Sequence, residues 1–178
     1  MKAPVLITER LILEPLSTKH LSLTYLSWLN DKEVCKYLSL DSMNQINQLK
    51  DYLIQIEKSD ILYWAILLKS SKKHIGNIKI DPIIHKFGLC EYGILMGDKT
   101  EWSKGYAFEA SKRIIDYCFF ELNLRKMCLG VVDVNVNALK LYNKLNFKVE
   151  GIYRDHEFYD GKFCNGLRMA LFNLNYKK

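Results

Sequence analysis

The sequence of 178 residues contains no apolar run of the ~20 residues that a membrane span needs, and its N-terminal apolar stretch is too short for a secretory signal. Internal repeats, low-complexity tracts and linkers are absent as well. A chain of this length can bury a proper core within one domain. We therefore expect a cytoplasmic protein with no membrane partner and a single domain over residues 1–178.

Patterns typical of disulfides and metal sites are also missing. The cysteines are odd in number, widely separated and without a C-x-x-C pair. They are Cys35, Cys90, Cys118, Cys128 and Cys164. The histidines are equally scattered, and none belongs to a metal-site pattern. The sequence therefore predicts buried, reduced thiols and no bound metal.

Positive charge is present but is not concentrated. The formal net charge is +6, and the lysines are spread along the chain instead of forming a block. This balance favours an anionic ligand, although a solvated lysine surface explains it equally well, and it does not indicate nucleic acid. The G-x-x-x-x-G-K-[ST] and G-x-G-x-x-G fingerprints are absent, which disfavours nucleotide hydrolysis and dinucleotide binding.

The order of the apolar patterns predicts an α/β fold. Segments rich in β-branched and aromatic residues predict strands at 11–16, 63–69, 75–80, 88–96, 127–134 and 147–172, with turns at 81–82 and 159–162. Helical spacing predicts helices at 17–29, 30–37, 42–56, 105–122 and 138–145. Capping-box spacing of Asn30 with Glu33, and of Ser42 with Gln45, supports the second and third helices. We expect a mixed, mostly antiparallel sheet flanked by helices.

A glycine-bearing turn precedes the helix expected at 105–122. Ser103, Lys104 and Gly105 would aim unpaired backbone N–H groups at one point, reinforced by the helix dipole. Gly105 lets the backbone approach a ligand closely, and the small Ala107 leaves room beside it. The turn therefore suits a pyrophosphate, to which Lys99 and Lys104 can add charge. Many helices begin this way without binding anything, so the turn alone is weak evidence.

A series of short motifs runs along nearly the whole chain. They are Thr8–Leu16, Trp28–Val34, Ile75–Ile78, Glu91–Ile94, Trp102–Ala107, Asn135–Ala138, Tyr142–Phe147, Glu150–Gly151 and Arg154. The most specific, Trp102–Ala107, matches a W-G-K-G-Y-A acetyl-CoA signature with Ser103 in place of one glycine. Together these motifs resemble the GNAT acetyltransferase superfamily, and within it the branch of the ribosomal-protein N-terminal acetyltransferases.

Two further positions depart from that branch. Asn146 stands where glycine is usual, but asparagine tolerates the left-handed conformation well, so a helix can still end there. Asn165 stands where the branch usually has aspartate, which questions any role for a negative charge at that place. Ser103 keeps its backbone N–H and still serves the phosphate turn.

The resemblance implies a GNAT-like sheet that is splayed between two central parallel strands, at 93–96 and 127–132. It also implies acetyl-CoA as co-substrate, with the pantetheine arm pairing to the first of these strands. The residues that it assigns to the cofactor are Ile94, Leu95, Met96, Trp102, Ser103, Lys104, Gly105, Tyr106, Ala107 and Asn135. Dimers are common among the relatives, so a homodimer is compatible with the resemblance, and the sequence leaves the oligomeric state open.

Acetyl transfer to an amine needs a base for the nucleophile and an acid for the departing thiolate. Glu91 is our candidate base, although a solvent-facing carboxylate is an equally good interpretation. Glu109 is a weaker rival, because it can simply complement the helix dipole. Tyr142 aligns with the tyrosine that protonates the coenzyme A sulfur in several relatives, and core packing beside Leu141 and Leu145 is its alternative role.

Trp28 and Tyr37 are the candidates for the acceptor pocket, with core packing as the alternative. Cys90 beside Glu91 raises an acyl-cysteine route, but no histidine is placed to activate it, so direct attack is preferred.

We favour a small or nucleotide-linked amine such as an amino sugar as acceptor, because positive charge disfavours basic peptides and polyamines. A protein N-terminus is the alternative acceptor. A non-catalytic acetyl-CoA-binding regulatory module is the alternative of another class.

Overall fold

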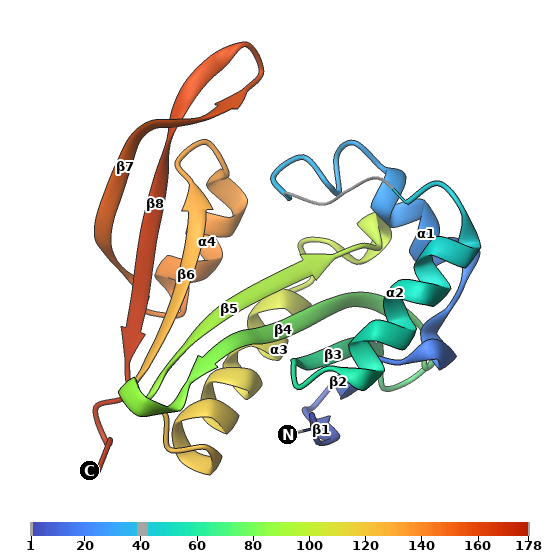
Figure 1. Cartoon of the computed structure of the whole chain (residues 1–178), viewed down its shortest axis with the longest axis horizontal. Coiled ribbons are helices and arrows are strands. Elements are labelled where there is room, and N and C mark those ends of the chain that lie inside the picture. Colours follow the sequence, from blue (N-terminus) through green and yellow to red (C-terminus); the bar gives the residue numbers. More distant parts are fainter. Residues whose placement is uncertain (1, 39–42, 178) are drawn as a thin grey trace. The chain divides into compact units, whose positions relative to one another are not determined.

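The computed structural model describes residues 2–38 and 43–177, and Figure 1 labels its elements. The strands are β1 (Leu6–Ile7), β2 (Leu11–Pro15), β3 (Leu62–Leu68), β4 (His74–Ile84), β5 (Leu89–Met96), β6 (Lys126–Val132), β7 (Lys148–Tyr159) and β8 (Lys162–Phe172). The α-helices are α1 (Leu23–Asn30), α2 (Ile46–Lys58), α3 (Tyr106–Asp116) and α4 (Val136–Lys144). Shorter helical segments are the 3-10 helices η1 (Thr18–His20), η2 (His85–Phe87) and η3 (Lys99–Glu101), and the π-helix η4 (Tyr117–Glu121).

Within the described residues the strands follow the order β1-β2-β3-β4-β5-β6-β8-β7 in one sheet. The ladders between β1, β2, β3 and β4 are antiparallel, as are those of β8 with β6 and β7, whereas β5 and β6 run parallel. The parallel ladder joins Leu89–Glu91 to Lys126–Cys128, although β5 continues to Met96. The predicted fold class, an α/β fold with a mixed, mostly antiparallel sheet, is therefore confirmed.

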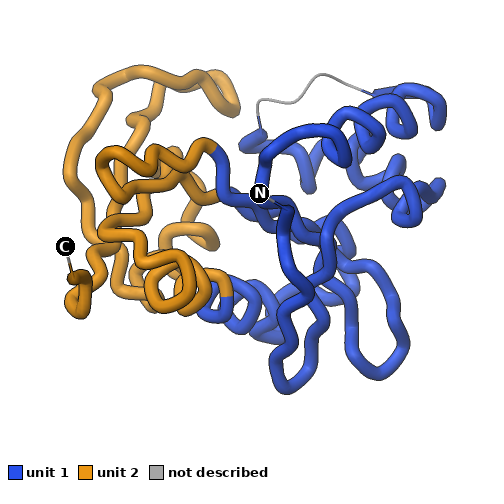
Figure 2. Tube along the Cα trace, turned by 60° about the horizontal axis from the view of Figure 1, so that its bottom comes forward, with its two compact units in different colours: residues 1–81, 93–113 blue, residues 82–92, 114–178 orange. Residues whose placement is uncertain are grey.

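The chain forms two compact units, which Figure 2 colours separately. Unit 1 comprises Met1–Asp81 and Gly93–Arg113, and unit 2 comprises Pro82–Tyr92 and Ile114–Lys178. That residues 1–178 act as a single domain stays a prediction. None of the described helices is long and apolar enough to cross a membrane.

The core of unit 1 forms where α1 and α2 pack against the sheet. One buried cluster includes Tyr25 and Trp28 of α1, Leu49 and Leu53 of α2, and Ala65 of β3. Residues four apart in a helix share one face, which explains why Leu49 and Leu53 are both fully buried. The same face of the sheet therefore carries both N-terminal helices, and α3 lies on the opposite side of these strands (Figure 1).

The helix predicted at 30–37 is wrong. Asp31 ends α1 with extended backbone (ψ 117°), and residues 32–37 form turns and a bend. The Asp31 carboxylate accepts the backbone N–H groups of Glu33 (2.9 Å) and Val34 (3.2 Å), as a helix N-cap does, and the Cys35 N–H bonds the Asp31 carbonyl at 2.9 Å, but the chain does not continue as a helix beyond this turn. The helix predicted at 42–56 is confirmed from Ile46, with Gln45 as its N-cap, whereas the predicted cap Ser42 lies outside the described residues.

Two other boundaries differ from the prediction. The turn expected at Asp81–Pro82 does not form, and β4 continues to Ile84. The β3–β4 ladder already ends at the pair Leu62–Ile80, so the missing N–H of Pro82 interrupts no bond in it. The helix expected at 105–122 changes at Tyr117 from α to π geometry.

In unit 2, β7 and β8 form a long hairpin that extends beyond the end of β6 (Figure 1). Its two-residue turn places Asp160 at φ 51° and Gly161 at φ 77°. Positive φ at both central residues defines the turn that matches the twist of paired strands. The predicted strand pair with a turn at 159–162 is thus confirmed.

The burial of His74 in unit 1 should make the stability of the protein depend on pH. It packs against His20, Tyr25 and Trp28 at ring distances of 4.9–5.3 Å, and its Nε2 donates to Asn77 Oδ1 at 2.9 Å. Desolvation lowers the pKa of His74 from 6.5 to about 4. Below pH 6.5 the unfolded chain binds a proton that the folded chain still excludes, so the free energy of unfolding should fall as pH falls toward about 4.

We expect this group to remove about 2 kcal/mol of stability between about pH 7 and pH 5. Urea unfolding at both pH values should show that loss in the wild type, and the loss should shrink by this amount in His74→Gln. His85→Gln is the matched control, because His85 is exposed. An equal change of pH dependence in both variants would contradict the prediction.

Candidate functional site

The loop between β5 and α3 is fixed by hydrogen bonds within unit 1. The Trp102 indole Nε1 donates to the carbonyl of Met96 at 2.9 Å, which ties the loop to the end of β5. Asp98 caps the turn η3 by accepting the backbone N–H of Thr100 at 2.9 Å and its hydroxyl at 2.6 Å. The loop therefore starts from a rigid strand end and arrives at the first residue of α3, Tyr106, with a defined path.

The backbone of this loop alternates in handedness. Ser103 (φ 62°) and Gly105 (φ 83°) are left-handed, whereas Trp102 (φ −67°) and Lys104 are not. Such alternation turns successive N–H groups toward one point and forms an anion-binding concavity, here at the N-terminus of a helix. Residues Ser103, Lys104 and Gly105 are exposed, so an anion can reach them. A non-glycine residue in this conformation costs about 1 kcal/mol, so the surrounding contacts must hold Ser103 in place.

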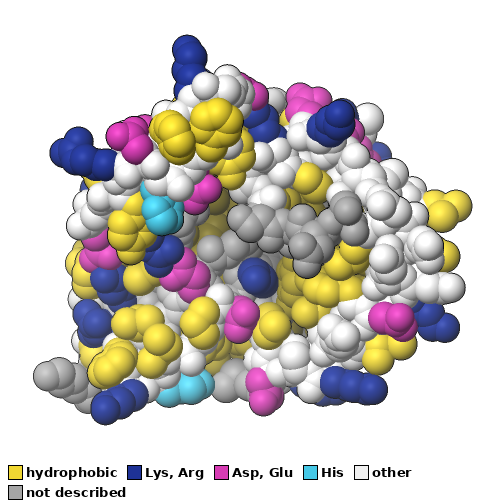
Figure 3. Space-filling view, turned by 45° about the horizontal axis from the view of Figure 1, so that its top comes forward, with side chains coloured by type: hydrophobic (Ala, Val, Ile, Leu, Met, Phe, Trp, Pro, Cys, Tyr) yellow, Lys and Arg dark blue, Asp and Glu magenta, His cyan; other side chains and the backbone are white. Residues whose placement is uncertain are grey.

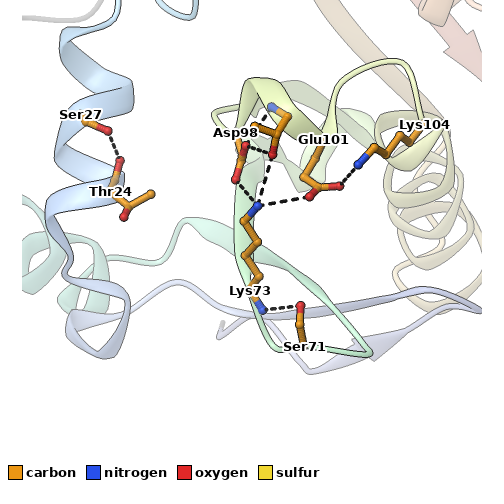
Figure 4. Close-up of polar contacts among 8 residues, drawn as sticks. Thr24, Ser27, Ser71, Lys73, Asp98, Glu101 and Lys104 are labelled. Carbon is orange, nitrogen blue, oxygen red and sulfur yellow. Dashed lines mark hydrogen bonds and ion pairs between the residues drawn. The ribbon is translucent and has the colours of Figure 1, made fainter.

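An ion network supports one side of the loop, as Figure 4 shows. Lys73 Nζ lies 2.7 Å from Asp98 Oδ2 and 3.2 Å from Glu101 Oε1. Lys104 Nζ lies 2.8 Å from Glu101 Oε2. Lys99 is paired as well, with Asp31 at 2.7 Å. Both lysines that the sequence offered to a phosphate are therefore engaged with carboxylates, and Lys73 is a member of the network that sequence reasoning missed.

A second group of contacts joins the loop to the N-terminal strands of unit 1. Arg10 Nη1 donates to the carbonyl of Lys104 at 3.0 Å, and Arg10 Nε donates to Glu109 Oε2 at 2.6 Å. Glu109 Oε1 also accepts the backbone N–H of Arg10 (2.8 Å) and the hydroxyl of Thr8 (2.6 Å). Burial alone would raise the pKa of Glu109, but these donors hold it below its ordinary value. Glu109 therefore serves as a structural acceptor, which disfavours it as a base.

The two acceptor-pocket candidates differ in exposure. Trp28 is 5% exposed, and a Cβ built on Gly97 would overlap its ring atoms Cδ2 and Cε3. Its ring also lies 4.9 Å from that of His74. This burial favours the core-packing alternative for Trp28. Tyr37 is only partly buried, with Lys36 Nζ 5.4 Å from its ring centre, and an acceptor role for either residue stays a prediction.

In unit 2, the candidate base Glu91 forms an ion pair that the sequence did not reveal. Arg168 Nη2 lies 2.7 Å from Glu91 Oε2. Arg168 stands on β8 opposite Gly130 of β6, while Glu91 of β5 stands opposite Cys128 of β6. The guanidinium thus crosses β6 to reach β5, and a Cβ on Gly130 would lie 3.1 Å from Arg168 Nη1. The small residue at 130 leaves room for this crossing.

The candidate acid Tyr142 lies in an aromatic cluster of unit 2. Its ring is 6.0 Å from that of Tyr92 and 5.9 Å from that of Phe147. Desolvation raises the pKa of Tyr142 to about 12, so its hydroxyl stays protonated at neutral pH. Because successive strand residues point to opposite faces, Tyr92 and Glu91 lie on opposite faces of β5. Tyr142 therefore lies on the face opposite Glu91, where it can serve a different reacting group.

The asparagines of unit 2 have defined partners. Asn135 caps α4, because its Oδ1 accepts the backbone N–H of Ala138 at 3.2 Å. Asn165 Nδ2 donates to Asp133 Oδ2 at 2.8 Å, so this pair still carries one negative charge although position 165 is not aspartate. Asn146 follows α4 at φ 68°, which confirms the left-handed conformation predicted for it.

The cysteines in the described part of the chain are free thiols. Cys90, Cys118 and Cys164 are buried, and Cys90 lies on the face of β5 opposite Glu91. The full burial of Cys90 disfavours the acyl-cysteine route. Among the described residues, no group of three or more His, Cys, Asp or Glu could hold a metal ion. On the face that Figure 3 shows, lysines and arginines are scattered among acidic and apolar side chains.

A family model described as an acetyltransferase (GNAT) domain matches residues 10–148 of the chain. The chain belongs to the GNAT acetyltransferase family. It is 30% identical over 175 residues to an uncharacterized N-acetyltransferase, p20, of Bacillus licheniformis, covering 96% of this chain and 97% of that protein. The GNAT chain described here is therefore an N-acetyltransferase, and acetyl-CoA is the donor that this fold uses.

Solved structures of GNAT proteins share the fold. Ribosomal-protein-S5-alanine acetyltransferase from Vibrio fischeri superposes with a TM-score of 0.83 at 17% identity, over 98% of this chain and 100% of that one. Spermidine N-acetyltransferase from Vibrio cholerae, solved with CoA and spermine, has a TM-score of 0.82 at 24% identity, over 95% and 99%. The high TM-scores establish that the chain has the GNAT fold, and at these low identities the acceptors of the two enzymes do not carry over to this chain.

Proposed function

We propose that the chain transfers an acetyl group from acetyl-CoA to the primary amine of a small or nucleotide-linked molecule, such as an amino sugar, by direct attack. One observation supports the binding of an anionic acetyl donor: the backbone at Ser103–Gly105, just before α3, alternates in handedness. When bound, acetyl-CoA supplies an activated thioester. The N–H groups of residues 103–107 would hold its pyrophosphate, and the backbone of Ile94, Leu95 and Met96 would hold its pantetheine arm. The Asn135 oxygen caps a helix, so a cofactor contact would use its Nδ2.

In this proposal Glu91 takes a proton from the acceptor amine, directly or through water. Its Oε2 is bound to Arg168, so Oε1 is the atom proposed to receive the proton. Tyr142 gives a proton to the departing thiolate; burial raises its pKa to about 12, which keeps the hydroxyl protonated before the transfer. The two residues lie on opposite faces of β5, which matches their service to two different groups, the incoming amine and the leaving sulfur.

A thiol-release assay with acetyl-CoA tests the acceptor. The panel contains amino sugars, their nucleotide-linked forms, polyamines and N-terminal peptides, with direct binding of CoA measured in parallel. We expect the highest kcat/KM with an amino sugar or its nucleotide-linked form. Faster turnover of a peptide or of spermidine would replace the proposed acceptor. CoA binding without turnover of any amine would instead support a non-catalytic regulatory module.

The other expectations from the sequence also stay proposals. They concern cytoplasmic location, homodimer formation and the absence of nucleic-acid partners. On the face that Figure 3 shows, the basic side chains are scattered, whereas nucleic-acid binding draws on clustered lysines and arginines.

A further inference from the structure

Arg10 lies against the anion-binding loop and the start of α3 without belonging to either. Its Nη1 donates to the carbonyl of Lys104, the residue between the two left-handed positions Ser103 and Gly105. Its guanidinium lies 4.6 Å from the ring centre of Tyr106, the first residue of α3. A Cβ on Gly105 would lie 3.5 Å from Arg10 Nη2. The guanidinium therefore lies beside Lys104, Gly105 and Tyr106.

The partners of Arg10 fix it in this orientation. Glu109, in the first turn of α3, receives Arg10 Nε and the Arg10 backbone N–H, and it also receives the Thr8 hydroxyl. The Glu109 side chain is only 16% exposed, whereas that of Arg10 is 43% exposed. A charged pair held by several hydrogen bonds positions its members well. The Arg10 side chain is thus anchored at α3 on one side and bound to the loop carbonyl on the other.

The loop needs such support, because Ser103 adopts a conformation that is unfavourable for a residue with a side chain. A carbonyl bound at Lys104 fixes the peptide between the two left-handed residues, and so fixes the direction of the neighbouring N–H groups. Groups held in the binding geometry beforehand bind more tightly, because less conformational freedom is lost on binding.

We propose that Arg10 is a positioning residue for the pyrophosphate of coenzyme A, acting through the backbone of Ser103–Gly105 and not as a phosphate ligand. This inference rests on the proposed function, in which the same loop holds the cofactor. It assigns the Thr8–Arg10 segment, which precedes β2, a role in donor affinity.

Three acetyl donors separate the alternatives. Acetyl-CoA and its 3′-dephospho form both carry the pyrophosphate, and S-acetylpantetheine carries none. For Arg10→Ala we expect KM to rise roughly tenfold for both pyrophosphate donors, as for loss of a hydrogen bond to a charged group, with kcat almost unchanged. The slow reaction with S-acetylpantetheine should be unaffected. Arg10→Lys should behave like Arg10→Ala, because a single ammonium cannot reproduce the guanidinium contacts with both Lys104 and Glu109.

Two further variants test whether the effect is specific to the Arg10 contacts. Lys19→Ala removes a different ion pair of unit 1, with Glu14, and should leave all three KM values unchanged. Glu109→Gln, which weakens the anchor of Arg10, should shift KM in the same direction as Arg10→Ala and supplies a second variant if Arg10→Ala fails to fold. A loss confined to the donor with the 3′-phosphate, full rescue by Arg10→Lys, or an equal loss with all three donors would overturn the proposal. A wild-type protein that binds no CoA by calorimetry would refute the proposed function itself.

Discussion

Replacing Tyr142 by phenylalanine is expected to lower kcat about 10³-fold, within the range for loss of a general acid. The hydroxyl is the only group removed, because phenylalanine keeps the ring contacts with Tyr92 and Phe147. In the wild type, burial raises the pKa of this hydroxyl to about 12. It is therefore protonated up to about pH 11, and Tyr142 should add no decline of kcat on the basic side below that pH. Thiol release across pH measures both expectations.

Tyr92→Phe is the matched control for this experiment. Tyr92 is a buried tyrosine, 5% exposed, of the same aromatic cluster, and its ring meets that of Tyr142 edge to face. If Tyr142 acts as an acid, kcat of Tyr92→Phe should stay near the wild-type value. Equal losses in both variants would show that the cluster matters through packing alone. Urea unfolding of both variants checks that the fold is retained.

Much of the fold was predictable because it depends on local patterns. The strand composition of 88–96, the helical spacing that leads to α2 and the turn at 159–162 each follow from side chains within a few residues. The left-handed Asn146 was predictable for the same reason, since asparagine is among the few residues that adopt positive φ readily. Local signals failed at 30–37, where the Asp31 side chain caps a turn that does not continue as a helix.

The chemistry of the site was less predictable, because its partners are far apart in the sequence. Arg10 and Glu109 are 99 positions apart, and Arg168 and Glu91 are 77 positions apart. Neither arginine carries a local signal that distinguishes it from a solvated one. The small Gly130 beside Arg168 was the one available hint, and it becomes interpretable only once the β6–β8 register is known. That Tyr142 and Glu91 lie on opposite faces of β5 likewise becomes clear only once the position of α4, which carries Tyr142, is known.

The largest expected change in stability comes from Gly97→Ala, at about 4 kcal/mol. A Cβ at this position would overlap Trp28, a side chain that is 5% exposed. The backbone cannot yield easily, because the N–H groups of Gly97 and Asp98 both bond the carbonyl of Ile75, at 3.0 and 3.1 Å. The indole must therefore leave its place, and the loss approaches that of a buried tryptophan. Urea unfolding should show this loss, together with a melting temperature lower by roughly 10 °C.

Two comparisons identify the cause of that loss. Gly151→Ala is the matched control, because its Cβ would meet Arg168 at an ordinary 4.0 Å, and its stability should be unchanged or slightly higher. If the overlap with Trp28 is responsible, Gly97→Ala should cost much less when Trp28 is already leucine, which a double-mutant cycle measures. Additive losses in the double variant would contradict this account. They would place the cost in the backbone between β5 and η3, the segment from which the anion-binding loop departs.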